Sequence, residues 1–167
     1  MKTLSAVLVQ LEKPLILAEL EIPPLRRGQV LVEVAYSGVC HTQILESRGH
    51  RGNDPYLPHC LGHEGSGIVS EIGEGVTKVK PGDQVILSWM KGSGEDVNSA
   101  TYQWNGSSVN AGAITTFSRY SVISDKEGLS LPFPPSGGSG SMPCAAPGIA
   151  ARLIVPLCRC CSLLSRY

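Results

Sequence analysis

The sequence lacks an excess of charge of either sign. Its 14 Lys and Arg balance 14 Asp and Glu, so the formal net charge is zero and the sequence pI is near 6.9. A chain built to bind nucleic acid or an anionic membrane surface carries a basic excess or a basic patch. We therefore expect neither nucleic acid nor a membrane as a partner.

Acidic residues are missing from the last forty positions. Residues 128–167 carry three Arg and no Asp or Glu, whereas residues 1–127 carry 11 basic and all 14 acidic side chains. Ordinary usage of about 25% charged residues would place roughly five acids in such a stretch. A Pro, Gly and Ser segment at 132–141 has the composition of a linker. We expect a domain over residues 1–131 and a linker with an atypical tail over 132–167.

Long apolar runs and dense cysteines are also absent. No stretch approaches the roughly 20 apolar residues of a membrane-spanning helix. Six cysteines in 167 residues are too sparse for a disulfide framework. The sequence therefore predicts a cytoplasmic protein with reduced thiols.

Helical periodicity is scarce, and short apolar runs bounded by Gly, Pro or charged residues predominate. These runs predict strands at 7–10, 30–35, 67–72, 84–87 and 118–124, and one short helix at 42–48. Such a pattern favours a mainly β barrel or sandwich over a doubly wound α/β sheet. The polar segment 88–116 is interpreted as an excursion from the barrel, with a hairpin around Asn105–Gly106.

Two segments combine glycine with side chains that bind metals. Gly38-Val39-Cys40-His41-Thr42 offers a thiolate, an imidazole and a hydroxyl, and Gly62-His63-Glu64-Gly65-Ser66-Gly67 offers an imidazole and a carboxylate. Zinc takes such S, N and O ligands, three from the protein in a catalytic site. Residue types alone leave a structural role open, because isolated Cys and His pairs are more often structural. The flanking His59 and Cys60 are interpreted as loop and packing residues.

The order of these residues, and not only their type, is informative. The chain resembles the N-terminal catalytic domain of zinc-dependent alcohol dehydrogenases of the medium-chain dehydrogenase/reductase family. The resemblance covers roughly residues 2–131 and is carried by Gly-Val-Cys-His-Thr at 38–42, Pro-His-Cys-Leu-Gly-His-Glu-Gly-Ser-Gly-Ile-Val at 58–69, Gly-Glu-Gly-Val at 73–76 and Lys-Pro-Gly-Asp-Gln-Val at 80–85. It implies a GroES-like β-barrel and an oxidoreductase that converts alcohols to aldehydes or ketones with NAD or NADP.

The resemblance also implies roles for individual residues. Cys40 and His63 are implied as ligands of one catalytic zinc, and Glu64 as the adjacent carboxylate that approaches or replaces a ligand. Thr42 matches the hydroxyl that bonds the substrate oxygen and begins the proton relay. His41 matches a position that contacts the cofactor pyrophosphate. Cys144, in a loosely matching segment, is the candidate third ligand.

Some positions depart from the family pattern. Gln43 stands where many relatives have an Asp that orients the zinc-bound His. We expect the side-chain carbonyl of Gln43 to accept the N–H of that imidazole instead. Leu45 stands where the best-known liver enzymes have a relay His, so the proton path to solvent differs. No cysteine lies between Cys60 and Cys144, so we expect no structural zinc.

A nucleotide-binding signature is missing as well. No G-x-G-x-x-G turn follows a predicted strand, so we expect a truncated family member without a Rossmann domain, inactive alone, whose tail is a remnant of the entry to the cofactor domain. NAD or NADP would act only with a supplied Rossmann domain, and the substrate would be a small alcohol or carbonyl compound. Homo-oligomers, as in full-length relatives, stay open. Two alternatives also remain: a non-catalytic zinc-binding or assembly module, and a zinc-free quinone-reductase-like relative.

Overall fold

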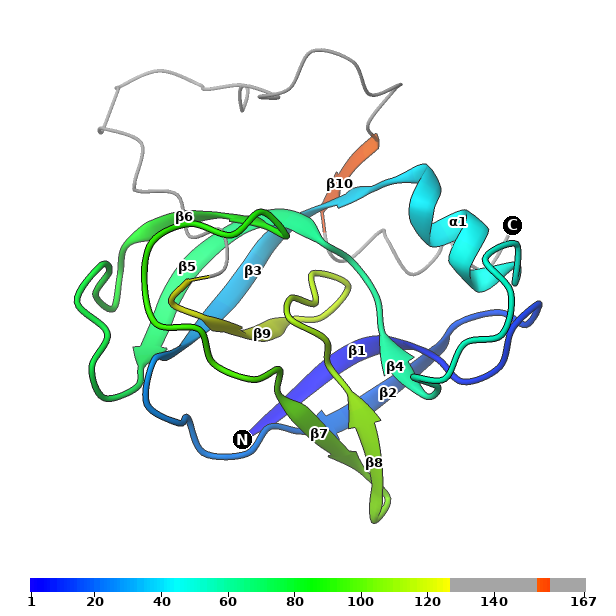
Figure 1. Cartoon of the computed structure of the whole chain (residues 1–167), viewed down its shortest axis with the longest axis horizontal. Coiled ribbons are helices and arrows are strands. Elements are labelled where there is room, and N and C mark those ends of the chain that lie inside the picture. The colour runs from blue at the N-terminus through cyan, green and yellow to red at the C-terminus, as the bar shows by residue number, and fades with distance from the viewer. Residues whose placement is uncertain (127–152, 157–167) are drawn as a thin grey trace.

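The computed structural model describes residues 1–126 and 153–156, and over these the chain is mainly β, as the sequence predicts (Figure 1). One helix and ten strands are formed: β1 (Lys2–Leu8), β2 (Ile16–Glu21), β3 (Gln29–Val39), α1 (His41–Ser47), β4 (His59–Cys60), β5 (Glu64–Ile72), β6 (Gln84–Ser88), β7 (Thr101–Trp104), β8 (Ser107–Asn110), β9 (Tyr120–Ser124) and β10 (Leu153–Pro156). Within the described ranges, no helix is long and apolar enough to cross a membrane.

Five of the strands form a closed barrel in the order β1-β2-β7-β8-β4. All neighbours are antiparallel except β4 and β8, which run parallel and close the ring onto β1. The interior is filled by alternate side chains, among them Val7, Leu20, Tyr102 and Val109, each fully buried. Burial raises the pKa of the Tyr102 hydroxyl, whose oxygen accepts the Val122 N–H at 2.9 Å. Apolar burial on this inner face is the main stabilising term of the barrel.

The hairpin predicted around Asn105 and Gly106 is confirmed, but its assignment to an excursion outside the barrel is wrong. Both residues have positive φ, 49° and 80°, as a two-residue type I′ turn requires. The strands on either side, β7 and β8, are barrel staves rather than an appendage (Figure 1). Their inward positions are few, Tyr102 and Val109, so the outward polar residues dominate the local composition and conceal two short strands.

A second sheet carries the longest strand and leads to the site. Its order is β10-β3-β5-β6, and β9 also pairs with β3. The valines at 30, 32 and 34 of β3 pack with Val69 of β5 and Val85 of β6 in one buried cluster. The β3–β5 register shifts between Val34 and Tyr36, and such an irregularity bends a strand and redirects the residues beyond it. The ends of β3 and β5 past this bend are where the metal-capable residues lie.

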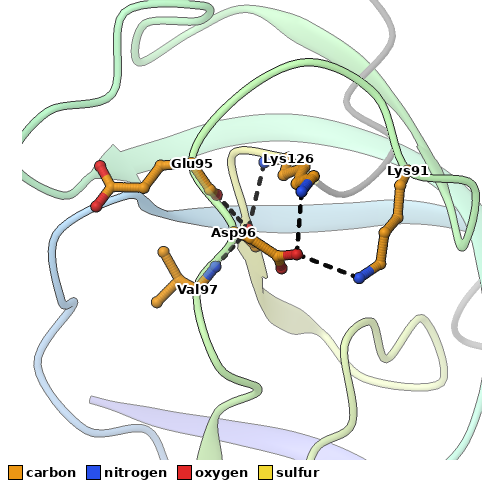
Figure 2. A network of polar contacts seen from close by, with 6 residues as sticks. Lys91, Glu95, Asp96, Val97 and Lys126 are labelled. Carbon is orange, nitrogen blue, oxygen red and sulfur yellow. Dashed lines mark hydrogen bonds and ion pairs between the residues drawn. The ribbon is translucent and has the colours of Figure 1, made fainter.

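The polar loop before β7 is fixed to the second sheet by a few polar contacts (Figure 2). Ser124 of β9 donates its hydroxyl to the Glu95 carbonyl at 2.8 Å and accepts the Val97 N–H at 3.1 Å. The Asp96 carboxylate lies 3.1 Å from the Lys126 ammonium and 3.3 Å from the Lys91 ammonium. Hydrogen bonding to Lys126 and then to Lys91 lowers the pKa of Asp96. The lysine pairs are exposed and contribute little, so the buried Ser124 contacts are the main polar anchor of this loop.

Candidate metal centre

Pairing between β3 and β5 brings the two glycine-containing segments together. Ser37 is opposite Gly65 in the register, so the chain leaving β3 passes the residues that enter β5. One ligand atom from each of Cys40, His63 and Glu64 lies within 4.8 Å of the other two. All three side chains are half-buried, which leaves the cluster accessible to a small solute.

Gly38 leaves room for the Glu64 side chain to pack against β3. A Cβ at Gly38 would lie 2.9 Å from both Cγ and Oε1 of Glu64, closer than real carbon contacts allow. The backbone of Glu64 is held from the other side, because its carbonyl accepts the Thr116 hydroxyl at 3.0 Å. The carboxylate therefore packs across β3 in a defined place.

Gly62 meets a similar constraint just before His63. Its φ is +95°, and an added Cβ would lie 2.7 Å from the Phe117 backbone nitrogen. The Thr116 N–H donates to the Gly62 carbonyl at 3.2 Å and the Phe117 N–H to the Leu61 carbonyl at 3.1 Å. Segment 115–117 thus lies directly against the loop that presents His63, and a side chain at position 62 would separate them.

Gln43 connects Cys40 and His63, although not in the way that the sequence suggested. The Cys40 N–H donates to Gln43 Oε1 at 2.7 Å, and Gln43 Nε2 lies 2.7 Å from His63 Nδ1. The expectation that the Gln43 carbonyl accepts an imidazole N–H is therefore wrong, because the Cys40 backbone occupies that oxygen. Turning the amide over would place its NH₂ against the Cys40 N–H, donor against donor. In the observed arrangement the NH₂ donates and His63 Nδ1 accepts, so the ring proton belongs on Nε2.

The remaining predicted residues lie at the start of α1 or beyond the described part of the chain. Cys40 is the N-cap of α1, and its thiol donates to the Thr42 hydroxyl at 3.6 Å. Thr42 is half-buried and His41 is exposed at the first position of the helix. Cys144, and the tail predicted over 132–167 apart from β10, lie outside the described residues.

Two observations separate Cys60 and His59 from this cluster. Cys60 lies in the barrel core, and burial raises the pKa of its thiol to about 12, which agrees with a packing role. His59 belongs to a second group of metal-capable side chains, with Glu46 and Asp54. Sequence reasoning missed this group, because the three residues come from separate segments that form no recognisable spacing.

Comparison with known proteins identifies the class of the fold. The sequence profile of the alcohol dehydrogenase GroES-like domain matches residues 26–133, which is well over half of the chain. The chain belongs to this family. The resemblance noted from the motifs and the mainly β fold class are thereby confirmed, and residues 1–126, which the structure describes, form no Rossmann domain.

Particular relatives are longer than this chain. S-(hydroxymethyl)glutathione dehydrogenase of Escherichia coli O6:H1 is 45% identical over 97 residues, 57% of this chain and 26% of that protein. The chain therefore spans about a quarter of the length of the curated relatives it matches. Benzyl alcohol dehydrogenase of Acinetobacter calcoaceticus is 27% identical with a TM-score of 0.62, over 76% of this chain and 40% of that one. An alcohol dehydrogenase zinc-binding domain protein of Burkholderia ambifaria, 21% identical with a TM-score of 0.65 over 76% of this chain and 41% of its own, shows the same fold.

Proposed function

We propose that this chain supplies the metal-binding and substrate-binding half of a zinc-dependent alcohol dehydrogenase. Cys40, His63 and Glu64 would hold one zinc ion, with Cys144 as a further ligand. The observation that carries the proposal is the approach of a thiol, an imidazole and a carboxylate to within 4.8 Å of one another. Sulfur, nitrogen and oxygen are the ligand atoms of catalytic zinc sites, which keep one position for substrate.

The chain's own residues account for substrate orientation and the first proton transfer. A zinc ion in this cluster would supply a Lewis acid that polarises the oxygen of an alcohol or carbonyl compound. The Thr42 hydroxyl lies against the Cys40 thiol, so it is placed to hydrogen-bond that oxygen and to accept its proton while releasing its own hydroxyl proton toward solvent. The half-buried Leu45 has no exchangeable proton, so the relay from Thr42 runs by another route. The exposed His41 is accessible to the pyrophosphate of a dinucleotide.

Hydride transfer needs a nicotinamide, and the described residues form no nucleotide-binding domain. We therefore expect the chain to turn over only when a Rossmann domain with bound NAD or NADP is supplied. The substrate class is a small alcohol or the corresponding carbonyl compound. Free thiols persist in reducing compartments, which favours the cytoplasm, and a homo-oligomer, as in full-length relatives, stays a hypothesis.

Cobalt substitution tests the metal ligands directly. Cobalt(II) bound to a thiolate gives a charge-transfer band in the near ultraviolet, whereas cobalt bound to nitrogen and oxygen alone does not. We expect this band in the purified chain, its loss in the Cys40→Ser, Cys144→Ser double variant and its retention in Cys60→Ala, which removes a buried thiol outside the cluster. Absence of the band in the unchanged chain would refute the proposed site and favour a zinc-free, quinone-reductase-like relative.

Activity measurements separate the catalytic proposal from a non-catalytic zinc-binding module. We expect no NAD- or NADP-dependent alcohol oxidation by the chain alone, and turnover when a complementing Rossmann domain is added. Oxidation by the chain alone that disappears in Cys40→Ala would refute the first expectation. Stoichiometric zinc with no turnover in either case would favour the non-catalytic module.

A further inference from the structure

A second group of metal-capable side chains lies apart from the Cys40 cluster. It consists of Glu46 in α1, Asp54 in the loop after that helix and His59 in β4, with one ligand atom of each within 4.8 Å of the other two. The side chains of His59 and Asp54 are only 9% and 11% exposed. None of the three residues is shared with the first cluster.

The imidazole of His59 is held at both ring nitrogens. Its Nδ1 lies 3.0 Å from the Cys60 carbonyl oxygen, and a carbonyl only accepts, so Nδ1 carries a proton and donates it. Nε2 lies 2.8 Å from Oδ2 of the Asp54 carboxylate, so without a cation a proton lies between these two atoms, and a bound cation would take its place. Histidines that ligate metals commonly donate their other ring N–H to a backbone carbonyl in this way. The carbonyl belongs to the barrel wall and is not part of the cluster.

The Asp54 carboxylate is also held from outside the cluster. Its Oδ1 accepts the Tyr56 N–H at 2.9 Å, while Oδ2 is the atom near the His59 ring. Carboxylate ligands are typically oriented by such a second hydrogen bond. His59 Nε2 and Asp54 Oδ2 therefore point toward one place, which a proton or a cation can occupy.

The charges of the group favour a divalent cation. Two carboxylates beside a neutral imidazole carry two negative charges, and protonation of the ring would still leave one uncompensated. Like charges at this separation, with little exposure, disfavour each other. A doubly charged cation neutralises both carboxylates and leaves the imidazole uncharged, as a ligand must be.

We propose that Glu46, Asp54 and His59 form a second divalent-cation site, distinct from the Cys40 cluster, for zinc or a similar first-row transition metal. One imidazole and two carboxylates suit such metals better than calcium or magnesium, which take oxygen ligands. A bound ion fastens the loop after α1 to both α1 and β4. Because α1 carries Thr42 and the chain from β4 leads to His63, the second ion holds both segments of the first cluster in place.

The test uses the full chain with both Cys40→Ser and Cys144→Ser, which removes the two proposed thiolate ligands of the first site and leaves the second group intact. We expect this variant to retain one equivalent of cobalt or zinc, without a thiolate band. Adding Glu46→Gln lowers its affinity for the metal by at least about tenfold, while the His59–Asp54 pair stays in place to preserve the fold. Glu71→Gln, on an exposed position of β5, is the matched control and leaves the affinity unchanged.

The outcomes distinguish this site from the proposed catalytic site. Loss of all bound metal in the Cys40→Ser, Cys144→Ser double variant, with circular dichroism unchanged, overturns the second site. Equal metal affinity with and without Glu46→Gln also overturns it. If the unchanged chain binds one equivalent of metal without a thiolate band, and Glu46→Gln abolishes this binding, the second site is supported and the first is refuted. Added cation should also raise the Tm of the double variant. Loss of this rise in Asp54→Asn gives independent support, and an unchanged rise in Asp54→Asn counts against the site.

Discussion

Replacing Gln43 by Glu is expected to tighten zinc binding at the Cys40 cluster. His63 Nδ1 lies against Gln43, so a metal in this cluster would bind at Nε2, and the ring proton would then be on Nδ1. That proton then meets the NH₂ of Gln43, donor against donor, because Gln43 Nε2 and His63 Nδ1 lie 2.7 Å apart. Rotation of the amide does not relieve this conflict, because it moves the NH₂ onto the Cys40 N–H.

A carboxylate at position 43 removes the conflict. One oxygen accepts the Cys40 N–H and the other accepts the His63 Nδ1–H. Gln43 is only 2% exposed, and a hydrogen bond to a charged group contributes about 1.5–3 kcal/mol. The added negative charge also destabilises the metal-free cluster beside Glu64. Both effects act in the same direction, and we expect zinc to bind about 10–100-fold more tightly, or about 1.4–2.8 kcal/mol.

The assay is a competition titration of zinc against a chromophoric chelator. Gln43→Met serves as the matched control, because it keeps the side-chain length and removes both polar groups. We expect the Met variant to bind zinc no more tightly than the unchanged chain. If Gln43→Glu folds normally by circular dichroism and shows no gain in affinity, or if Met gives the same gain, the argument from the ring proton is wrong.

Three further substitutions test packing and electrostatics. Gly62→Ala combines backbone strain with a steric clash and should lower the free energy of unfolding by about 2–4 kcal/mol. Gly82 has a φ of +93° but open space around it, so Gly82→Ala should lower the free energy of unfolding by only about 1–2 kcal/mol. Urea unfolding measures both values, and equal losses would contradict the steric clash. Because the pKa of Cys60 is about 12 in the fold and 9.0 for a free thiol, stability should fall above pH 9 as the unfolded thiol ionises first, by up to about 1.4 kcal/mol per pH unit. Cys60→Ala should flatten this slope in unfolding series at alkaline pH, and an unchanged slope would assign it to other groups. Asp96→Asn should lower Tm more at low than at high salt, because its ion pairs are exposed and screened; a salt-independent effect would indicate a role beyond these pairs.

The strands of the second sheet were predictable because their apolar runs are long enough to dominate the local composition. The runs at 30–35, 67–72 and 84–87 lie within β3, β5 and β6, and the predicted helix overlaps α1 almost entirely. β2 was missed, because Glu19 and Glu21 alternate with buried Ala18 and Leu20 and mask its inner face. β4 has two residues, too few for any periodicity, and exists only because the barrel closes there.

The Cys40 cluster was predictable in its members but not in its contacts. The motif order names Cys40, His63 and Glu64, and the antiparallel pairing of β3 and β5 brings them together. The orientation of Gln43 depends on competition between the Cys40 N–H and the His63 ring for one oxygen, which only coordinates reveal. The second cluster has no sequence signature at all, because Glu46, Asp54 and His59 meet through the path of a loop.

The order in which the chain emerges during synthesis gives the site a further property. All six ligand candidates that the structure describes lie between residues 40 and 64, and they are synthesised before β6 and the β7–β8 hairpin. The barrel cannot close without that hairpin. A nascent chain therefore carries its cation-binding side chains exposed for a period, and N-terminal segments fold first as synthesis proceeds. If these side chains bind metal as proposed, binding can begin during translation, before the finished barrel buries the ligands.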